Sequence, residues 1–400
     1  MKKKLLLLGG SSYLLPVIKA CKKHNITVYT ADYLPNNIAH KYSDGYFNVS
    51  VVDKEAVLSL AKELKVDGIN AFATDAGVKT MAYVAEKLGL PCVGSYKSVE
   101  ILQDKPKFRK FLRDNDFLTP KFESFTNYND ALKHIDNFNF PIMVKPADSA
   151  GSKGVTKVVM MEDFKKACDF ALSFSIQKEF IIEEYIESSG PPSDSDSFSI
   201  DGKLVYHTIN SQYFDKDAPG DHAPCAYVYP TIWPLEARAT LSSELQRLIT
   251  LLELKTSVYN IESRISARNG EVYIMEVSPR GGGNRLSEMV RYAYGLDFIE
   301  ATVLHSVGEK FDFPEARLNN YIWVEIILHS HDDGTFEKLI IDDKIKNCIV
   351  ELDLLVKPGD NVEAFSAANK MIGTAVLKID SGLDSYVRNH IHNLVKVKIK

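Results

Sequence analysis

The amino-acid sequence predicts an α/β protein, with an open parallel sheet at the N-terminus followed by units that mix helices and strands. Short apolar runs alternate with helical patterns through the first hundred residues, which is typical of parallel strands joined by crossover helices. Residues 115–187 contain closely spaced strands around a helix and predict a small α+β unit. The chain has 400 residues, and at about 150 residues per domain it has room for two or three domains.

Composition excludes several classes of protein. Charged residues make up 25% of the chain and hydrophobic residues 45%, as in ordinary soluble domains. The net charge is −5 and no basic stripe is present, so we expect no nucleic-acid partner. The five cysteines are widely spaced, which excludes CxxC motifs and favours a reducing, cytoplasmic location. The apolar run near the start breaks at residues 9–12, so Leu5–Leu8 predicts a buried strand rather than a signal peptide, and no segment is long enough to span a membrane.

The N-terminal elements predict where a ligand would lie. We expect strands at 4–8, 27–30, 68–73 and 90–93, and helices ending near 23 and over 54–64 and 78–88. Ligands of parallel sheets bind at the carboxyl ends of the strands, so the turn containing Gly10 and the pair Thr74-Asp75 are expected to face a pocket. The turn lacks the GxGxxG fingerprint, which favours a structural turn or a substrate contact over a dinucleotide site.

Further elements follow along the rest of the chain. A helix is expected at 105–113 with Asp104 as its N-cap. Residues 188–197 are the most loop-like stretch, and 357–360 predict a turn. The remaining expected helices are 161–174 and 236–254, and the remaining strands are 140–145, 155–159, 180–185, 198–200, 258–267, 272–278, 321–328, 349–355 and 374–379.

The hairpin over residues 258–280 predicts a metal site. Asn269-Gly270 is a strong turn signal, and a three-residue loop with Gly270 left-handed places Glu262 directly opposite Glu276. The same face then holds Asn260 opposite Ser278, with Arg264 and Arg280 alongside. Directly opposed like charges are destabilising unless a cation lies between them, so the pattern favours Mg²⁺ bridging phosphates. Two alternatives stay open: exposed glutamates on a solvated face, or a two-residue loop that separates them.

Two more segments predict nucleotide contacts. Lys145 ends a strand and precedes a glycine- and serine-rich loop, whose backbone N–H groups can wrap phosphate oxygens; an ordinary turn is the alternative. The loop is not a P-loop, because it lacks that motif and precedes a strand. The strand over 180–186 can present backbone groups to an adenine edge, or can be a plain edge strand.

In this order, the motifs resemble the ATP-grasp superfamily. They are Asp104-Lys105, Lys145 with Ser149–Gly154, Glu183-Glu184-Tyr185-Ile186, and Glu262 with Glu276-Val277-Ser278-Pro279-Arg280. The N-terminal unit looks like the domain that precedes this fold in members similar to biotin carboxylase and carbamoyl-phosphate synthetase. The resemblance implies a Rossmann-like domain at 1–103, an ATP-grasp domain at 104–305 whose residues 115–187 clamp the nucleotide, and a small α+β domain at 306–400.

The resemblance also implies an activity. A small-molecule carboxylate is phosphorylated by ATP, and an amine displaces the phosphate from the acyl phosphate. The cofactors would be ATP and Mg²⁺, with Mn²⁺ as a substitute. An amino-acid ligase and a phosphoribosylglycinamide-synthetase-like enzyme are both open. The alternatives are an ATP-binding regulatory protein without ligase chemistry, or a carboxylase-type subunit. A homodimer is an expectation at the level of the family.

The residues take their roles from this resemblance. Lys145 and Arg280 are the predicted catalytic residues, and the metal ligands are Glu262, Glu276 and Ser278, where Ser278 replaces the usual asparagine. The predicted ATP contacts are Lys105, Lys145, Ser149, Gly151, Ser152, Lys153, Gly154, Glu183, Glu184, Tyr185, Ile186 and, for the ribose, Glu187, with Asp194 and Asp196 as alternatives. The weaker substrate candidates are Gly10, Asp75, His222, Gly282, Gly283, Asn284 and Arg285.

Overall fold

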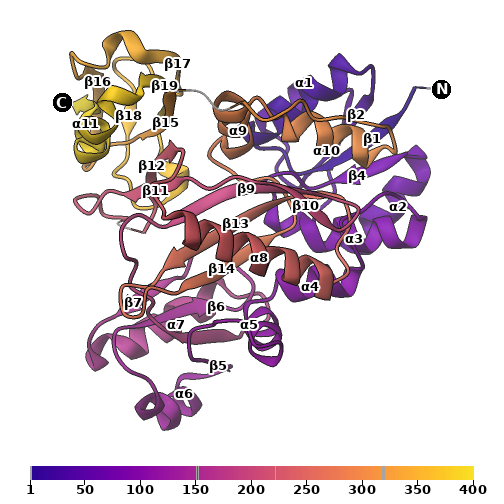
Figure 1. The fold of residues 1–400 in the computed structure, drawn as a ribbon. Helices are drawn as coiled ribbons and strands as arrows, with labels where there is room; N and C mark the ends of the chain where they lie inside the picture. The colour runs from indigo at the N-terminus through magenta and orange to yellow at the C-terminus, as the bar shows by residue number, and fades with distance from the viewer. Residues whose placement is uncertain (1, 150, 152, 221, 318–319) are drawn as a thin grey trace.

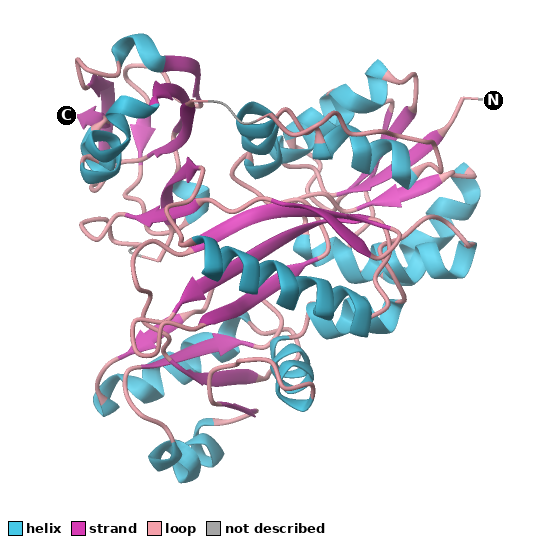
Figure 2. Ribbon diagram, viewed as in Figure 1, coloured by secondary structure: helices cyan, strands magenta, loops and turns pink. Residues whose placement is uncertain are grey.

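The computed structural model describes residues 2–149, 151, 153–220, 222–317 and 320–400. Figures 1 and 2 show a long antiparallel sheet across the middle of the molecule. The N-terminal unit lies at one upper corner of this view, the C-terminal unit at the other, and a small unit lies below the sheet (Figure 1). Among the described residues, no helix combines the length and the apolar character that a membrane span needs.

The N-terminal unit confirms the predicted parallel sheet. Its strands lie in the order β3-β2-β1-β4, all parallel. Strand β4 ends at Asn70, earlier than predicted, and α3 begins at Asp75, which therefore starts a helix rather than lying in a loop. Residues 90–93 form no strand, and β3 was not predicted. The elements are β1 (Lys4–Leu8), α1 (Leu15–Lys23), β2 (Thr27–Ala31), β3 (Gly45–Phe47), α2 (Lys54–Leu64), β4 (Gly68–Asn70), α3 (Asp75–Leu88) and α4 (Tyr96–Leu102).

The central sheet has the order β10-β9-β13-β14 and is antiparallel throughout. Its strands are β9 (Ser193–Ile200), β10 (Lys203–His207), β13 (Ser257–Ile265) and β14 (Val272–Ser278). Helix α8 (Leu235–Leu251) covers one face, and its Leu241, Leu245 and Leu248 belong to the same apolar core as Ile261 and Val277. The prediction of a loop over residues 188–197 is wrong in its second half, because Ser193–Ser197 form a buried strand inside this sheet.

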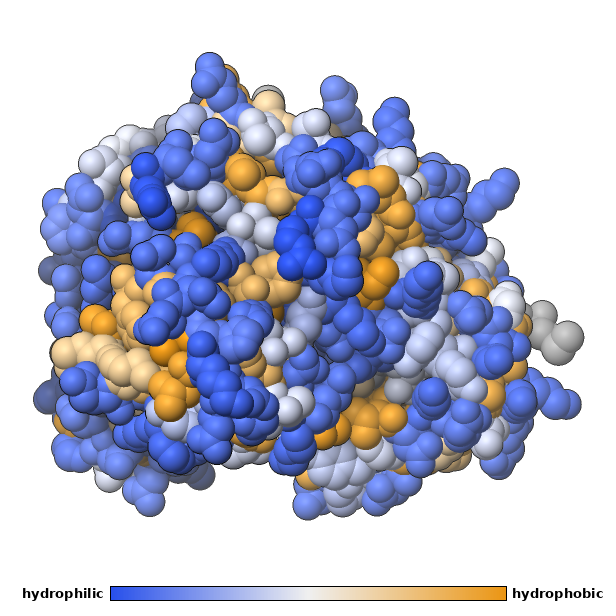
Figure 3. Space-filling model, turned by 90° about the horizontal axis from the view of Figure 1, so that it is seen from below, coloured by the Kyte–Doolittle hydropathy of each residue, from blue (hydrophilic) through white to orange (hydrophobic). Residues whose placement is uncertain are grey.

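The small unit holds a four-stranded antiparallel sheet in the order β5-β8-β6-β7. Asp104 caps α5 as predicted, and its Oδ1 accepts a hydrogen bond from the Lys107 N–H at 3.0 Å. Hydrophilic side chains cover most of the lower face of the molecule, with apolar side chains in separate areas (Figure 3). The elements are α5 (Lys105–Asp114), β5 (Phe122–Phe125), α6 (Tyr128–His134), β6 (Ile142–Pro146), β7 (Thr156–Val158), α7 (Phe164–Phe174) and β8 (Phe180–Glu184).

The C-terminal strands complete a sheet that begins earlier in the chain. Its order is β11-β12-β15-β19-β17, so strands before and after residue 305 belong to one sheet. The turn predicted at 357–360 is present, with the Asp360 N–H bonded to the Lys357 oxygen. The elements are β11 (Ser211–Phe214), β12 (Pro224–Tyr229), α9 (Leu286–Tyr294), α10 (Phe298–Ser306), β15 (Tyr321–Leu328), β16 (Gly334–Ile341), β17 (Ile349–Leu354), β18 (Asn361–Val362), β19 (Gly373–Asp380), α11 (Asp384–Asn389) and β20 (Val395–Ile399).

Candidate functional site

Strands β13 and β14 bring the two predicted carboxylates together. Glu262 lies directly opposite Glu276, and Asn260 lies opposite Ser278. The turn differs from the prediction, because the Ser266 N–H bonds to the Glu271 oxygen and leaves four residues in the loop. A bulge at Met275 restores the predicted register before Glu276 is reached. Gly270 is left-handed as expected, with φ +72°.

Strand β9 adds one more polar residue beside each of these two pairs, on the same face of the sheet. Asp194 lies opposite Glu262, and Asp196 lies opposite Asn260. The face therefore carries two rows of three polar side chains, one across each level of the sheet. Both aspartates are buried, at 9% and 0% exposure. The alternating Ser-Asp pattern of residues 193–197 is the period-two signal of a strand, but its composition is that of a loop.

Hydrogen bonds satisfy the two buried aspartates. Asp196 accepts from the Gly282 N–H at 2.9 and 3.1 Å and from the Ser287 hydroxyl. Asp194 accepts from Asn260 at 2.6 Å and from the Tyr227 hydroxyl at 3.1 Å. Burial raises the pKa of each carboxyl to about 6 despite these donors. Asp196 thus fixes the turn after β14, and Asp194 is held by β13 and β12. These contacts argue against either aspartate binding ribose.

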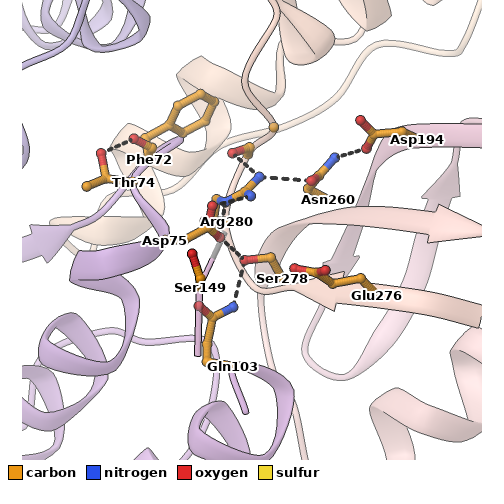
Figure 4. Close-up of polar contacts among 12 residues, drawn as sticks. Phe72, Thr74, Asp75, Gln103, Ser149, Asp194, Asn260, Glu276, Ser278 and Arg280 are labelled. Atoms are coloured by element: carbon orange, nitrogen blue, oxygen red, sulfur yellow. Dashed lines mark hydrogen bonds and ion pairs between the residues drawn. The ribbon is translucent and has the colours of Figure 1, made fainter. Parts of the chain in front are cut away.

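Arg280 lies at the centre of a network that joins the central sheet to the N-terminal unit (Figure 4). Its Nε and Nη2 donate to the Asp75 carboxylate at 2.8 and 2.7 Å, and its Nη1 donates to the Asn260 side-chain oxygen at 2.9 Å. Burial opposes ionisation of Asp75, but the charge and hydrogen bonds of Arg280 outweigh it and lower the pKa of Asp75. Arg280 is therefore held in one orientation beside the carboxylate pair.

Ser278 belongs to the same network, which changes its predicted role. Its hydroxyl donates to Asp75 at 2.9 Å and accepts from the Gln103 amide at 2.8 Å (Figure 4). The side chain is 1% exposed. These two hydrogen bonds use the hydroxyl proton and one of its two lone pairs, so the structure gives Ser278 a positioning contact. Its role as a metal ligand stays a prediction.

Two lysines approach the carboxylate pair from the small unit. Lys105, in the first turn of α5, donates to the Ser149 backbone oxygen at 2.7 Å and lies 3.9 Å from the Glu276 carboxylate. Lys145, on β6, donates to Glu183 at 2.7 Å. Burial together with the positive charges of Arg109 and Lys105 lowers the pKa of Lys145 in spite of Glu183. Positive and negative side chains thus converge from two units, as phosphate binding with a metal requires.

Glu183 differs from its predicted role as an adenine contact. Its side chain is 1% exposed and pairs with both Lys145 and Arg109, the latter at 2.8 Å. Burial alone would raise the pKa of Glu183, but the two cations lower it to about 2. The carboxylate therefore orients Lys145 and does not face a base. Glu184 accepts from the Asn139 side chain at 3.0 Å, which also commits it within the small unit.

The backbone after Glu184 links the small unit to the central sheet. The Tyr185 N–H bonds to the Pro141 oxygen, and the Ile186 oxygen accepts from Arg264 at 3.1 Å. Lys157 lies over the Tyr185 ring, 3.9 Å from its centroid. Glu187 is exposed, and its oxygen accepts from the Ala267 N–H. Ile186 and the Tyr185 ring remain the candidate base contacts, and the ribose role of Glu187 stays a prediction.

The glycine- and serine-rich loop has a fixed base and an exposed tip. Asp148 accepts from the Ser175 hydroxyl and from two backbone N–H groups after α7. Gly154 is buried and left-handed, and a Cβ there would lie 2.7 Å from Pro146. Gly151 and Lys153 are exposed, with open space around Gly151. Ser152, also predicted to contact ATP, lies outside the described residues.

The turn after β14 positions the predicted substrate residues. Gly282 is buried against Asp196, and Gly283 is half-buried. Asn284 is left-handed and accepts from the Tyr13 hydroxyl at 3.0 Å while donating to Tyr227 at 3.2 Å. The two tyrosines come from distant segments with no local motif, so sequence reasoning missed them.

Other substrate candidates have structural roles. Arg285 pairs with Glu288 and with Glu351 of β17, which ties it to the C-terminal sheet. Gly10 is buried, and a Cβ there would lie 2.5 Å from the His40 ring, so close packing explains this glycine. His222 is exposed in the connection between β11 and β12.

The carboxylate pair fits a hard divalent cation. Enclosure by the surrounding protein, with the negative charges of Glu276 and Asp194, raises the pKa of Glu262 to about 7, although its side chain is still exposed. Opposed carboxylates that repel each other in this way are suited to bind a cation between them. Carboxylate oxygens are the ligands that Mg²⁺ prefers, so Glu262 and Glu276 are suitable ligands.

Comparisons with curated proteins find distant relatives. The carbamoyl phosphate synthase large chain of Thermoanaerobacter sp. is 26% identical over 230 residues, which cover 56% of this chain and 20% of that protein. The corresponding protein of Campylobacter jejuni is 23% identical over 83% of this chain and 29% of its own length. The chain thus spans less than a third of the curated relatives that it matches.

Comparisons with solved structures find the same fold over the whole chain. The L-amino acid ligase of Bacillus licheniformis has a TM-score of 0.79 and 18% identity, covering 100% of this chain and 99% of that one. The phosphoribosylglycinamide synthetase of Anaerococcus prevotii has a TM-score of 0.76 and 20% identity, covering both chains completely. Residues 138–288 match the family model described as "ATP-grasp domain" and include Lys145, the segment after β8 and the opposed pair Glu262 and Glu276. Residues 138–288 of the chain are therefore similar to an ATP-grasp domain.

Proposed function

We propose that the protein is an ATP- and Mg²⁺-dependent ligase that joins a small-molecule carboxylate to an amine. The observation that carries the proposal is the convergence of Lys105, Lys145, Arg280 and the opposed pair Glu262 and Glu276 at the junction of three units. Phosphoryl transfer depends on positioning and charge neutralisation more than on covalent catalysis, and this set supplies both.

Each group has a role that follows from its surroundings. Lys105 and Lys145 bind phosphate oxygens, and the loop containing Gly151 and Lys153 covers them and excludes water. Glu262 and Glu276 would hold Mg²⁺, which neutralises phosphate charge when it is bound. Arg280 stabilises negative charge that develops on the transferred group, because Asp75 and Asn260 keep its guanidinium fixed.

The proposed reaction has two steps with a definite fate for each atom. A carboxylate oxygen of the substrate attacks the γ-phosphorus, and the bond to the ADP oxygen breaks. The amine then attacks the acyl carbon, an amide forms, and inorganic phosphate leaves with one oxygen from the original carboxylate. The amine loses a proton in this step. The loop that contains Gly151 and Lys153 protects the acyl phosphate from hydrolysis between the two steps.

The fate of that oxygen gives the test. Carboxylic acids labelled with ¹⁸O are incubated with ATP, Mg²⁺ and a panel of amino acids, amines and ammonia, and the phosphate is analysed by mass spectrometry. We expect phosphate with one ¹⁸O, formed only when one acid and one amine are both present. Glu276→Gln is the control that abolishes turnover. Unlabelled phosphate from every combination would contradict the proposal. If ¹⁸O entered the phosphate only when labelled bicarbonate was the acid, a carboxylase-type reaction would be identified instead.

A further inference from the structure

A separate group of ligand-type side chains lies at the edge of the C-terminal sheet. Asp215 follows β11, and His329 and His331 follow β15. The Nε2 atoms of His331 and His329 lie 2.8 and 3.2 Å from the same carboxylate oxygen of Asp215. One ligand atom from each residue lies within 4.8 Å of the others.

Sheet topology explains why these residues meet. Strands β11 and β15 are both antiparallel to β12, so they run parallel to each other and end at the same edge. His329 and His331 are separated by Ser330, which forms a bridge to Ala364 and keeps the backbone extended. Residues two apart on an extended chain point to the same side. Both imidazoles therefore turn toward the end of β11.

The hydrogen bonds of His329 direct its Nε2 toward the Asp215 carboxylate. Its Nδ1 lies 2.7 Å from the Ile327 backbone oxygen, which can only accept, so Nδ1 carries the proton. In the neutral ring, Nε2 then directs a lone pair at the Asp215 carboxylate 3.2 Å away. Two electron-rich atoms at this distance repel each other unless a proton or a metal ion lies between them. A metal-bound histidine commonly donates its other N–H to a backbone carbonyl in this way.

The site is held in place before a cation arrives. Asp215 is 5% exposed, and its Oδ1 accepts from the Asp217 N–H, which leaves Oδ2 toward the two imidazoles. The His329 ring stacks on Phe365 with centroids 4.4 Å apart. His331 has 47% of its side chain exposed, so it is free to adjust to an incoming ion. A second proton on His329 would also satisfy its contact, but the convergence of His331 on the same oxygen favours a metal.

We propose that Asp215, His329 and His331 bind a divalent transition-metal ion of the Zn²⁺ type, with solvent completing its coordination. Two imidazoles and one carboxylate suit such an ion better than Mg²⁺, which prefers oxygen ligands. The bound ion would fasten the connection over residues 215–223 to the end of β15. This connection contains His222, one of the predicted substrate residues. The proposal does not depend on the ligase activity, because it concerns residues outside the carboxylate pair.

The first test measures metal binding directly. Chelator-treated protein is titrated with Zn²⁺ by calorimetry in excess Mg²⁺, which occupies the carboxylate pair. We expect one Zn²⁺ per chain, and binding at least about 100-fold weaker in Asp215→Asn and in His331→Ala, since each loses a direct ligand. His331 is half-exposed, so His331→Ala should melt at the wild-type temperature without metal, which confirms that its fold is intact. His134→Ala is the matched control, because His134 also contacts a carboxylate, Glu123 at 2.9 Å, and should bind Zn²⁺ normally.

A second readout uses Co²⁺ in place of Zn²⁺. We expect visible absorption bands that appear with one equivalent of Co²⁺ and that His331→Ala removes. Glu276→Gln should retain these bands, which separates this site from the nucleotide site. Equal Zn²⁺ affinity in the wild type and in Asp215→Asn, or no stoichiometric binding at all, would overturn the proposal and leave a histidine–aspartate ion-pair cluster.

Discussion

Replacing Asp75 by asparagine tests whether the N-terminal unit orients Arg280. The Asp75→Asn side chain keeps the shape but loses the charge that accepts two guanidinium hydrogen bonds at 2.8 and 2.7 Å. The Arg280 side chain is 10% exposed and that of Asp75 is 21% exposed. Removing one partner of a buried pair costs about 3–5 kcal/mol, and the residual exposure of Asp75 favours the lower end, about 3 kcal/mol.

This free energy converts into a measurable change in melting temperature. At ~2.1 cal/mol/K of unfolding entropy per residue, a loss of about 3 kcal/mol lowers the melting temperature by about 4 °C in a chain of 400 residues that unfolds as one unit. A displaced Arg280 should also lower kcat about 100-fold, as loss of a fixed charge-stabilising donor does. Calorimetry and the phosphate-release assay measure the two effects. Asp53→Asn is the matched control, because Asp53 caps α2 and asparagine caps equally well.

The pH dependence gives a second signature of the same contact. Because the pKa of folded Asp75 is lowered, its ionised form stabilises the protein above the ordinary value of 3.8, and this stabilisation is lost as the pH falls through the folded pKa. The difference in melting temperature between the wild type and Asp75→Asn should therefore be constant near neutral pH and narrow in acid. Equal melting temperatures and equal kcat at pH 7 would refute the reasoning.

Three further substitutions test separate parts of the site. Lys145→Ala should weaken ATP binding about 10- to 100-fold by calorimetry with little loss of stability, because Glu183 keeps its second partner Arg109. Glu262→Gln should abolish turnover yet stabilise the metal-free protein at pH 8 by about 1 kcal/mol, a value discounted for solvent screening. The reason is that the pKa of Glu262 is raised in the folded protein, so its negative charge destabilises the fold as the pH rises toward 7. Glu325→Gln should melt at a higher temperature than the wild type above pH 5, and the difference should grow as the pH rises. Burial holds the pKa of Glu325 well above its usual range, and among the described residues its oxygens have no hydrogen-bond partner.

Each of these has a result that would contradict it. Unchanged ATP affinity in Lys145→Ala would remove this lysine from the nucleotide site, with exposed Lys165→Ala as the control. Lower stability of Glu262→Gln at pH 8 would mean that no repulsion with Glu276 exists in the metal-free protein. A melting temperature of Glu325→Gln that falls, or that follows the wild type at every pH, would show that the carboxyl has a partner.

The pairing of Glu262 with Glu276 could be predicted because local geometry decides it. The Asn269-Gly270 turn fixes where the hairpin reverses, and the period-two alternation then fixes which residues share a face. The predicted pairing is correct only because two differences between the predicted and the observed hairpin cancel. The loop is one residue longer than expected, and the bulge at Met275 absorbs the difference. No turn signal in the sequence announces such a bulge, so the correct pairing of Glu262 with Glu276 did not establish the exact turn.

The first part of strand β9, Ser193–Ser197, could not be predicted because its stability comes from distant residues. A run of serines and aspartates has low strand propensity and gives no apolar pattern. Asp196 is tolerated inside the sheet because the Gly282 N–H and the Ser287 hydroxyl approach it from the turn after β14. Asp194 is likewise satisfied by Asn260 and by Tyr227 of β12. Contacts separated by 33 to 91 residues decide this element, and no local pattern contains them.

The arrangement of charges is easier to explain by ligand binding than by folding. Glu183, Asp75 and Asp196 each have a charged or polar partner, so their burial is compensated. Glu262 and Glu276 face each other across the ladder, and the pKa of Glu262 rises as enclosure by the surrounding protein and like charge oppose ionisation. A glutamine at either position would relieve this repulsion at no cost in packing. An unrelieved repulsion beside well-compensated neighbours is expected where a cation completes the site, because strain at functional positions is offset by the rigid structure around them.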